Sequence, residues 1–213
     1  MDTIKSKYHE TLAATVIKNL EKRQMEGYYC PTVEDAEKLA FSFLKDGQTI
    51  SFGGSMTLEE TGMLTALRHD PSIHLIDRST AKTPDETKKM YHDALSSDVY
   101  FMSTNAITTG GELVNIDGTG NRVAALIYGP ETVVILAGMN KIAANVDEAL
   151  SRVHNVATAQ NCIRLDKKTP CAITRACADC LSPDCICNQV VITRRSGIKG
   201  RIKVLLIGES FGY

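Results

Sequence analysis

The sequence predicts an α/β fold, a mainly parallel β-sheet with helices on both of its faces. Short apolar segments typical of strands alternate along the chain with longer segments of helical periodicity. One of these, residues 99–103, is apolar enough to be buried on both faces, as strands of parallel sheets are. The 213 residues contain no internal repeat and no low-complexity linker, so we expect a single domain over residues 1–213.

Two helices are expected in the N-terminal region, residues 1–46. The first covers residues 2–26, where apolar side chains recur at every fourth position, and Gly27 supplies its C-terminal stop. The second begins after Thr32, a residue type favoured at the N-cap, and extends to Lys45. The first strand is therefore expected only after this region.

A glycine turn follows that first strand, residues 49–52. The turn is Gly53-Gly54-Ser55, and a helix is expected to begin at Thr57 with Glu60 in the capping-box position. Strand, glycine turn and helix in this order form the place where open α/β sheets bind ligands.

The next helix has a strong N-terminal signal. Thr83 and Pro84 are an N-cap residue and a proline at the first helical position, and this helix extends to Leu95. It lies between two expected strands, residues 73–76 and 99–103. This alternation is the pattern of a parallel sheet.

Residues 104–122 interrupt the alternation. The turn sequences Gly110-Gly111 and Asp117-Gly118 flank a strand-like segment, residues 112–116, so we expect an inserted hairpin. Residues 123–128 fit a short helix or a strand equally well.

The last third of the chain returns to alternating elements. A strand is expected at residues 132–137, followed by a helix that Asn145 caps. A cysteine-rich loop at residues 171–188 then precedes two final strands, residues 189–193 and 201–207.

Composition excludes several classes of function. The net charge of −1 provides no basic field for nucleic acid, and the chain has no tryptophan for stacking against bases. No signal peptide or long apolar run is visible. We therefore expect a cytoplasmic protein that binds neither nucleic acid nor membrane, and whose thiols stay reduced.

The cysteines form the most unusual feature of the sequence. Five of the seven fall in the loop at residues 171–188, whereas Cys30 and Cys162 are isolated. The loop contains a single Cys-x2-Cys pair, and zinc ribbons usually place two such pairs more than about ten residues apart. The compact spacing favours an iron–sulfur cluster over zinc, with metal-free thiols or redox disulfides as alternatives. The spacing is Cys171-x5-Cys177-x2-Cys180-x4-Cys185-x1-Cys187.

A second candidate site combines the glycine turn with the polar hairpin. Gly53, Gly54 and Ser55 would let a ligand approach the backbone at a helix N-terminus. The hairpin could line a pocket with amides, a carboxylate and a guanidinium. Alternatively, the glycines and the hairpin form only tight turns, in which the Asn and Asp side chains stabilise the turn conformation. The polar hairpin residues are Asn105, Thr108, Thr109, Asn115, Asp117, Asn121 and Arg122.

Three stretches resemble the lactate-utilisation domain (LUD) family. They are residues 52–60 (FGGSMTLEE), the middle stretch from 103–108 (STNAIT) through 114–125 (VNIDGTGNRVAA), and residues 169–188 with the cysteines. The resemblance covers nearly the whole chain. It is greatest to the single-domain branch with a cysteine segment, rather than to longer members that carry ferredoxin modules.

The resemblance implies a fold, an activity and a set of ligands. The fold would be that of the NagB/RpiA/CoA-transferase-like superfamily, and the family is tied to oxidation of L-lactate to pyruvate with iron–sulfur partner proteins. Four cysteines, Cys171, Cys177, Cys180 and Cys187, match the family pattern as metal ligands. Cys185 stands where a basic residue is usual and would be spare.

Three functions follow as hypotheses. The first is organic-acid oxidation or electron transfer, in which Gly53-Gly54-Ser55 cradles a small anionic substrate that Asn105, Asp117, Asn121 and Arg122 orient, Arg122 pairing with its carboxylate or phosphate. The second is an isomerase or transferase acting on a phosphorylated or CoA-linked substrate, with a structural cysteine loop. The third is a non-catalytic subunit, and a homodimer is expected from the frequency of such assemblies.

Overall fold

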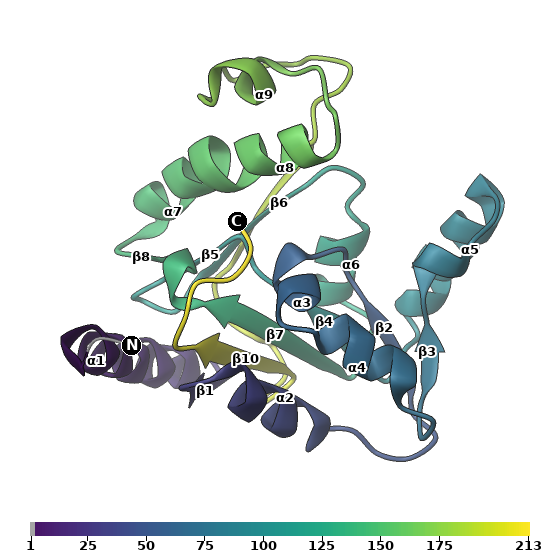
Figure 1. Ribbon diagram of the computed structural model, residues 1–213, viewed down its shortest axis with the longest axis vertical. Coiled ribbons are helices and arrows are strands. Elements are labelled where there is room, and N and C mark those ends of the chain that lie inside the picture. The colour runs from purple at the N-terminus through teal and green to yellow at the C-terminus, as the bar shows by residue number, and fades with distance from the viewer. Residues whose placement is uncertain (1–2) are drawn as a thin grey trace.

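The computed structural model describes residues 3–213 and places a six-stranded sheet at the centre of the molecule (Figure 1). Every pair of neighbouring strands in this sheet is parallel, which confirms the expected mainly parallel arrangement. In spatial order the strands are β1 (Glu26–Cys30), β10 (Ile202–Ile207), β7 (Thr132–Gly138), β4 (Val99–Met102), β2 (Thr49–Phe52) and β3 (His74–Ile76).

Three helices cover one face of this sheet. They are α2 (Val33–Phe41), α3 (Met56–Glu60) and α4 (Met63–His69). Val99 and Phe101 of β4 point toward them and pack in one buried cluster with Leu64 of α4. Burial of these apolar side chains is the main source of stability on this face.

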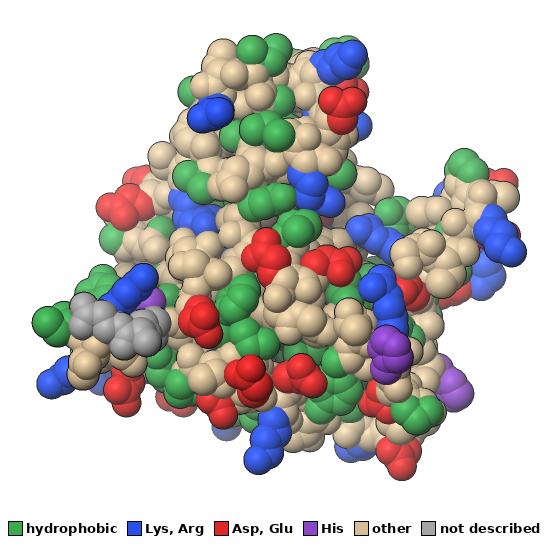
Figure 2. Space-filling view, viewed as in Figure 1, with side chains coloured by type: hydrophobic (Ala, Val, Ile, Leu, Met, Phe, Trp, Pro, Cys, Tyr) green, Lys and Arg blue, Asp and Glu red, His purple; other side chains and the backbone are tan. Residues whose placement is uncertain are grey.

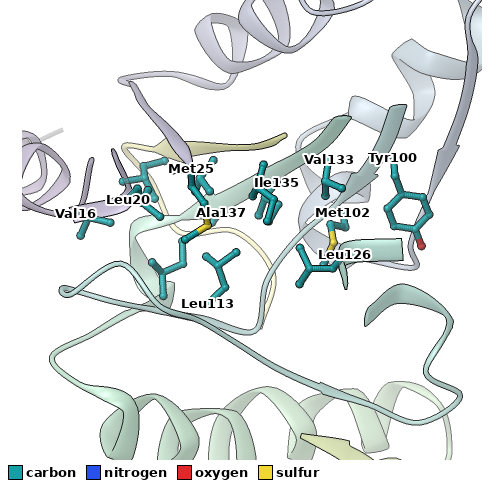
Figure 3. Packing of buried hydrophobic residues seen from close by; sticks show 14 of the residues in the cluster. Val16, Leu20, Met25, Tyr100, Met102, Leu113, Leu126, Val133, Ile135 and Ala137 are labelled. Atoms are coloured by element: carbon teal, nitrogen blue, oxygen red, sulfur yellow. The ribbon is translucent and has the colours of Figure 1, made fainter. Parts of the chain in front are cut away.

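The opposite face packs against α1 (Thr3–Lys22), α6 (Asn121–Ile127) and the inserted hairpin. Figure 3 shows Tyr100 and Met102 of β4 on this side, in the same cluster as Leu20 of α1 and Leu113 of the hairpin. Strand residues therefore alternate between two buried faces, as the apolar strand segments predicted. Helices on both faces and an inserted hairpin are confirmed.

The hairpin is part of a second, smaller sheet. Its order is β8 (Ile142–Ala143), β5 (Ala106–Thr108), β6 (Leu113–Asp117) and β9 (Gln189–Thr193). β5 and β6 are antiparallel, as expected of a hairpin, and β6 also pairs antiparallel with β9.

One long helical segment packs against this small sheet. It consists of α7 (Val146–Arg152), a π-helical turn (Val153–Ala157) and α8 (Thr158–Arg164). The short α9 (Pro170–Thr174) and the irregular cysteine segment lie beyond α8, at the top of Figure 1. Helix α5 (Pro84–Ala94) projects at the other side of the molecule, next to β3. None of the helices described here has the length and apolar character of a membrane span.

The expected N-terminal helix is too long at its C-terminal end. Helix α1 ends at Lys22 and the chain turns through Gln24, which has a positive φ of 60°. Residues 26–30 form the edge strand β1, which the sequence did not predict, and Gly27 lies in this strand. A Cβ on Gly27 would meet a side-chain carbon of Ile17 at 3.0 Å, so the glycine allows α1 to pack closely against β1. Residue 2 lies outside the described part of the chain.

The helix after the glycine turn begins one residue earlier than expected. Ser55, not Thr57, is its N-cap: the Ser55 side chain accepts a hydrogen bond from Leu58 N. Glu60 is not part of a capping box, because its carboxylate accepts from Gly212 N of the C-terminal tail.

The other helix boundaries agree with the sequence at the N-caps and differ from it at one C-terminal end. Thr32, Thr83 and Asn145 cap α2, α5 and α7 as expected. Helix α2 ends at Phe41 rather than Lys45. The ambiguous residues 123–128 belong almost entirely to α6.

The parallel arrangement brings four loops to one edge of the central sheet. Strands β2, β4, β7 and β10 all end there, because neighbouring parallel strands point the same way. The segments that follow them are the glycine turn 53–55, residues 103–105, residues 139–141 and the tail 208–213. This edge is therefore where a functional site is expected.

The Gly27→Ala substitution tests the packing of α1 on β1. The added methyl group would force the two elements apart, and overpacking of this kind costs about 1–3 kcal/mol of unfolding free energy. Urea unfolding measures the change. Gly197→Ala is the control because a Cβ there meets nothing within 4 Å. Equal stability of the two variants would contradict the assigned role of Gly27.

Candidate functional site

A cavity of about 550 Å³ lies at the carboxyl edge of the central sheet, and we call it the larger cavity. Its walls come from the glycine turn, the end of β4, the hairpin, α8 and the cysteine segment. Six of the seven residues expected in the anion site line it: Gly54, Ser55, Asn105, Asp117, Asn121 and Arg122. The seventh, Gly53, is buried behind the wall and donates its N–H to Phe101 O.

Arg122 lies in the first turn of α6 and uses all its donors within the protein. The guanidinium has five N–H groups; four donate to oxygens of neighbouring loops, and Nε lies 3.3 Å from Asp117 Oδ2. The four acceptors are Ser103 O (3.2 Å), Asn115 Oδ1 (2.6 Å), Asn105 Oδ1 (3.0 Å) and Ile116 O (2.8 Å). We call Arg122 and these five partners the Arg122 network.

The members of this network also bind one another. Asn105 Oδ1 accepts from Ile116 N, and Asn105 N donates to the Asn115 side chain. Asp117 Oδ1 accepts from Gly120 N, which closes the turn before α6. Burial lowers the pKa of Arg122 and the Asp117 carboxylate opposes that shift. The expected pairing of Arg122 with a substrate anion would therefore require bonds within the network to break.

The two glycines of the turn make room for arginine side chains. A Cβ on Gly54 would lie 2.0 Å from Nη2 of Arg78, and one on Gly53 would lie 3.0 Å from Cγ of Arg122. Larger residues would displace both guanidinium groups. The glycine pair is thus explained by the close approach of two arginines to the backbone.

Four further basic side chains line the larger cavity, and the sequence analysis did not select them. They are Arg78, Lys141, Arg164 and Lys167. Among the described lining residues Asp117 is the only acid, and Arg122 neutralises it. Figure 2 shows Lys and Arg side chains on both sides of the hollow between the α8–α9 region and α5. The wall therefore has an excess of positive charge, which favours an anionic ligand.

Two of these cations, Arg78 and Arg164, make few hydrogen bonds within the described part of the protein. Arg78 donates to the Tyr91 hydroxyl (3.2 Å) and lies over the Tyr91 ring. Arg164 is exposed and donates to Asn161 Oδ1 (2.7 Å). Each keeps donors that a ligand could use, because a guanidinium has five.

Lys141 differs from these because it is buried, with 4% of its surface exposed. It follows the end of β7, and its Nζ donates to Ser103 Oγ (3.1 Å) and Thr104 O (3.3 Å). Burial, with Arg152 and Arg122 nearby, lowers the pKa of the amine to about 7. A lysine in this state can exchange protons or act as a nucleophile at neutral pH.

Six of the seven cysteines line a second cavity of about 340 Å³, which we call the cysteine cavity. They are Cys162, Cys171, Cys177, Cys180, Cys185 and Cys187, and His154 lies beside them. The four expected ligands are thus on one cavity, together with the expected spare Cys185. Cys162, which appeared isolated in sequence, reaches the cavity from α8, packed against Cys171. No spacing rule would have identified it.

The cysteine cavity is lined by thiols, which are the ligand type that zinc and iron–sulfur clusters both take. All seven cysteines are free thiols. Within residues 3–213, however, no three Cys, His, Asp or Glu side chains lie close enough together to hold an ion. Burial raises the pKa of Cys187 to about 12, with Cys185 adding to the shift.

The two cavities share a wall. Thr158, Cys185, Ile186 and Asn188 line both of them. Thr158 Oγ1 also lies 3.9 Å from Cys187 Sγ. A group held by the thiols would therefore lie on the other side of this wall from a ligand in the larger cavity.

A parallel sheet with helices on both faces and a polar cavity at the carboxyl ends of its strands defines an open α/β domain. The chain belongs to the LUD domain family, whose sequence profile matches residues 13–207. This confirms the family resemblance drawn from the glycine turn, the hairpin and the cysteine segment.

Several solved structures match the fold of this chain in whole or in part. A DUF162 family protein from Deinococcus radiodurans matches over 93% of this chain and 98% of its own, with a TM-score of 0.52 and 10% identity. Two partial matches are eIF2B delta from Chaetomium thermophilum (TM-score 0.35, 21% identity, 52% and 48% covered) and ribose 5-phosphate isomerase A from Methanocaldococcus jannaschii (0.33, 20%, 53% and 54%). The curated proteins contain no match.

Replacing Arg122 by Met tests the network. The change leaves the Asp117 carboxylate buried without its cation and removes donors from two backbone carbonyls, so we expect a loss of about 3–5 kcal/mol in unfolding free energy. Arg164→Met is the matched control, because among the described residues its exposed side chain bonds only Asn161, and the change should alter stability by less than about 0.5 kcal/mol. Similar losses in the two variants would refute the structural role of Arg122.

Proposed function

We propose that the larger cavity binds a small organic anion, and that the domain serves in organic-acid oxidation of the lactate type. The observation that carries this proposal is the convergence of Arg78, Lys141, Arg164 and Lys167 on a cavity whose only described acid is already paired. Of these, Arg78 and Arg164 have no carboxylate partner among the described residues, and unpaired guanidinium groups in a concave site favour binding of a carboxylate.

The expected site residues take different parts in this proposal. Arg78 and Arg164 bind the anion directly, because they keep free donors. Ser55 offers its hydroxyl hydrogen, since its oxygen already accepts from Leu58 N. Asn121 lines the cavity and supplies an amide. Arg122 acts as a positioning residue that fixes the hairpin wall.

For the cysteine cavity we propose Cys171, Cys177, Cys180 and Cys187 as ligands of an iron–sulfur cluster or of zinc. Six thiols around one cavity support this assignment, and Cys162 or Cys185 could replace a member of the set. An iron–sulfur cluster would supply one-electron transfer, and zinc would give a structural site. The wall shared with the larger cavity supports a role in oxidation.

A second candidate function is isomerisation or group transfer on a phosphorylated or CoA-linked substrate. The size of the larger cavity favours it: about 550 Å³ and four additional cations exceed what one carboxylate requires. In that case the cysteine segment would be purely structural.

A protein partner also fits the cysteine segment. Leu181 is 99% exposed and Ile173 is 80% exposed, both in the part of the chain that encloses the thiols. Side chains as exposed as these are accessible to a protein partner. We propose that iron–sulfur partner proteins contact this region, whereas a homodimer is a separate proposal that sedimentation would test.

Ligand binding to the larger cavity can be measured by calorimetry with lactate, pyruvate, ribose 5-phosphate and a CoA ester. We expect binding of the organic acids, with the affinity about tenfold lower in Arg78→Met and in Arg164→Met, because each removes a charged hydrogen-bond donor. Lys38→Met, on the exposed surface of α2, is the control. Binding of phosphorylated or CoA compounds alone would favour the second candidate, and no binding at all would contradict both.

Metal content is tested by anaerobic purification followed by an absorption spectrum and assays of iron, sulfide and zinc. We expect bound metal that is lost in Cys171→Ser and Cys187→Ser, because thiolates are the ligands. Cys30→Ala should keep the metal, since Cys30 is buried in a different cluster. A colourless wild-type protein without metal would end the proposal of a metal site.

A further inference from the structure

Lys141 occupies an unusual position for a charged residue. The polypeptide leaves the carboxyl end of β7 and forms a 3-10 turn (Met139–Lys141) that directs the side chain into the larger cavity. Only 4% of the residue's surface is exposed, yet none of its hydrogen bonds within residues 3–213 is with a carboxylate. A buried lysine without an acidic partner is rare and usually functional.

The hydrogen bonds of Lys141 match a neutral amine. A charged ammonium has three N–H donors, but among residues 3–213 only Ser103 Oγ and Thr104 O accept from Nζ. A neutral amine has two N–H groups, so both acceptors are used and the lone pair remains free. In the charged form one N–H would lack a protein acceptor.

The surrounding charges also favour the neutral form. Arg152 faces Lys141 from α7 and Arg122 faces it from α6, and these two cations outweigh Glu60 of α3. Glu60 is partly occupied, because its carboxylate accepts from Gly212 N. Arg152 is fixed by donating to Asn140 O (3.0 Å) and Asn105 O (2.7 Å).

We propose that Lys141 is a nucleophile of the larger cavity, which condenses with the carbonyl carbon of a bound 2-oxo acid to form an imine. The inference rests on the proposed anion-binding function of this cavity. The Nζ lone pair forms the new C–N bond, and the carbonyl oxygen leaves as water with the two amine hydrogens. No electrons are exchanged, so no further reactant is needed.

Lys167, the other lysine of the cavity, is unsuited to this chemistry. It is only half-buried, and its Nζ lies 4.0 Å from Asp184 Oδ1. Its ion pair with Asp184 engages the amine outside the role of a nucleophile. Selective reaction at Lys141 therefore separates nucleophilic attack from simple electrostatic attraction.

Reductive trapping tests the proposal. The full chain is incubated with pyruvate and sodium cyanoborohydride, and intact-protein mass and peptide mapping locate the adduct. We expect one adduct per chain, at Lys141, forming faster as the pH rises through about 7, because the neutral amine is the reacting form. Lys141→Arg should reduce adduct formation at least about tenfold, whereas Lys18→Arg, on the exposed surface of α1, should leave it unchanged.

Calorimetry with pyruvate and lactate on the same samples separates the two proposals. If pyruvate binds but no adduct forms at Lys141, the nucleophile proposal is overturned while anion binding stands. An adduct spread over surface lysines, or undiminished in Lys141→Arg, also overturns it. If neither acid binds and no adduct forms, the proposed function fails as well. Because peptide mapping of the wild type locates the adduct directly, the test does not depend on folding of the variant.

Discussion

The carboxyl edge of the central sheet depends on one buried guanidinium. Arg122 joins the end of β4, the turn before β5 and the end of β6, which would otherwise leave carbonyl and carboxylate oxygens unpaired in a largely buried region. Only 11% of the Arg122 side-chain surface is exposed, so the cost of leaving its charge unpaired would be high. The network offsets the cost of burying this charge, because every guanidinium N–H has an oxygen partner. These bonds also fix one wall of the larger cavity.

This arrangement determines which groups of the cavity are available to bind a ligand. Since the Arg122 donors are used internally, a ligand must be recognised by groups outside the network, and Arg78, Arg164 and Lys141 are placed for this. The glycine turn has a related role, because Gly54 lets the Arg78 guanidinium lie against the backbone. The lowered pKa of Lys141 is linked to the network as well, because burial, Arg152 and Arg122 all lower it. Structure and chemistry at this edge are therefore coupled.

The features that were predicted correctly from the sequence are those determined by residues close to one another along the chain. The caps at Thr83 and Asn145 and the hairpin at 104–122 are local features, and all were correct. Strand β1 was missed because its signal is weak and its stability comes from pairing with the distant β10. Lys141 follows an apolar strand, which is a usable signal, but its burial and free lone pair depend on loops far apart in sequence. For Cys162 the helical sequence gave no indication, since only the fold of α9 against α8 brings it to the other thiols.

We infer that an anion binds beside the Arg122 network and leaves the network intact. A crystal structure of the chain with oxamate, an unreactive analogue of a 2-oxo acid, tests this directly. We expect oxamate within hydrogen-bond distance of Arg78, Arg164 or Lys141, with the contacts of Arg122 to Asp117 and Asn115 retained. A carboxylate bound in bidentate fashion by Arg122, with Asp117 displaced, would contradict it.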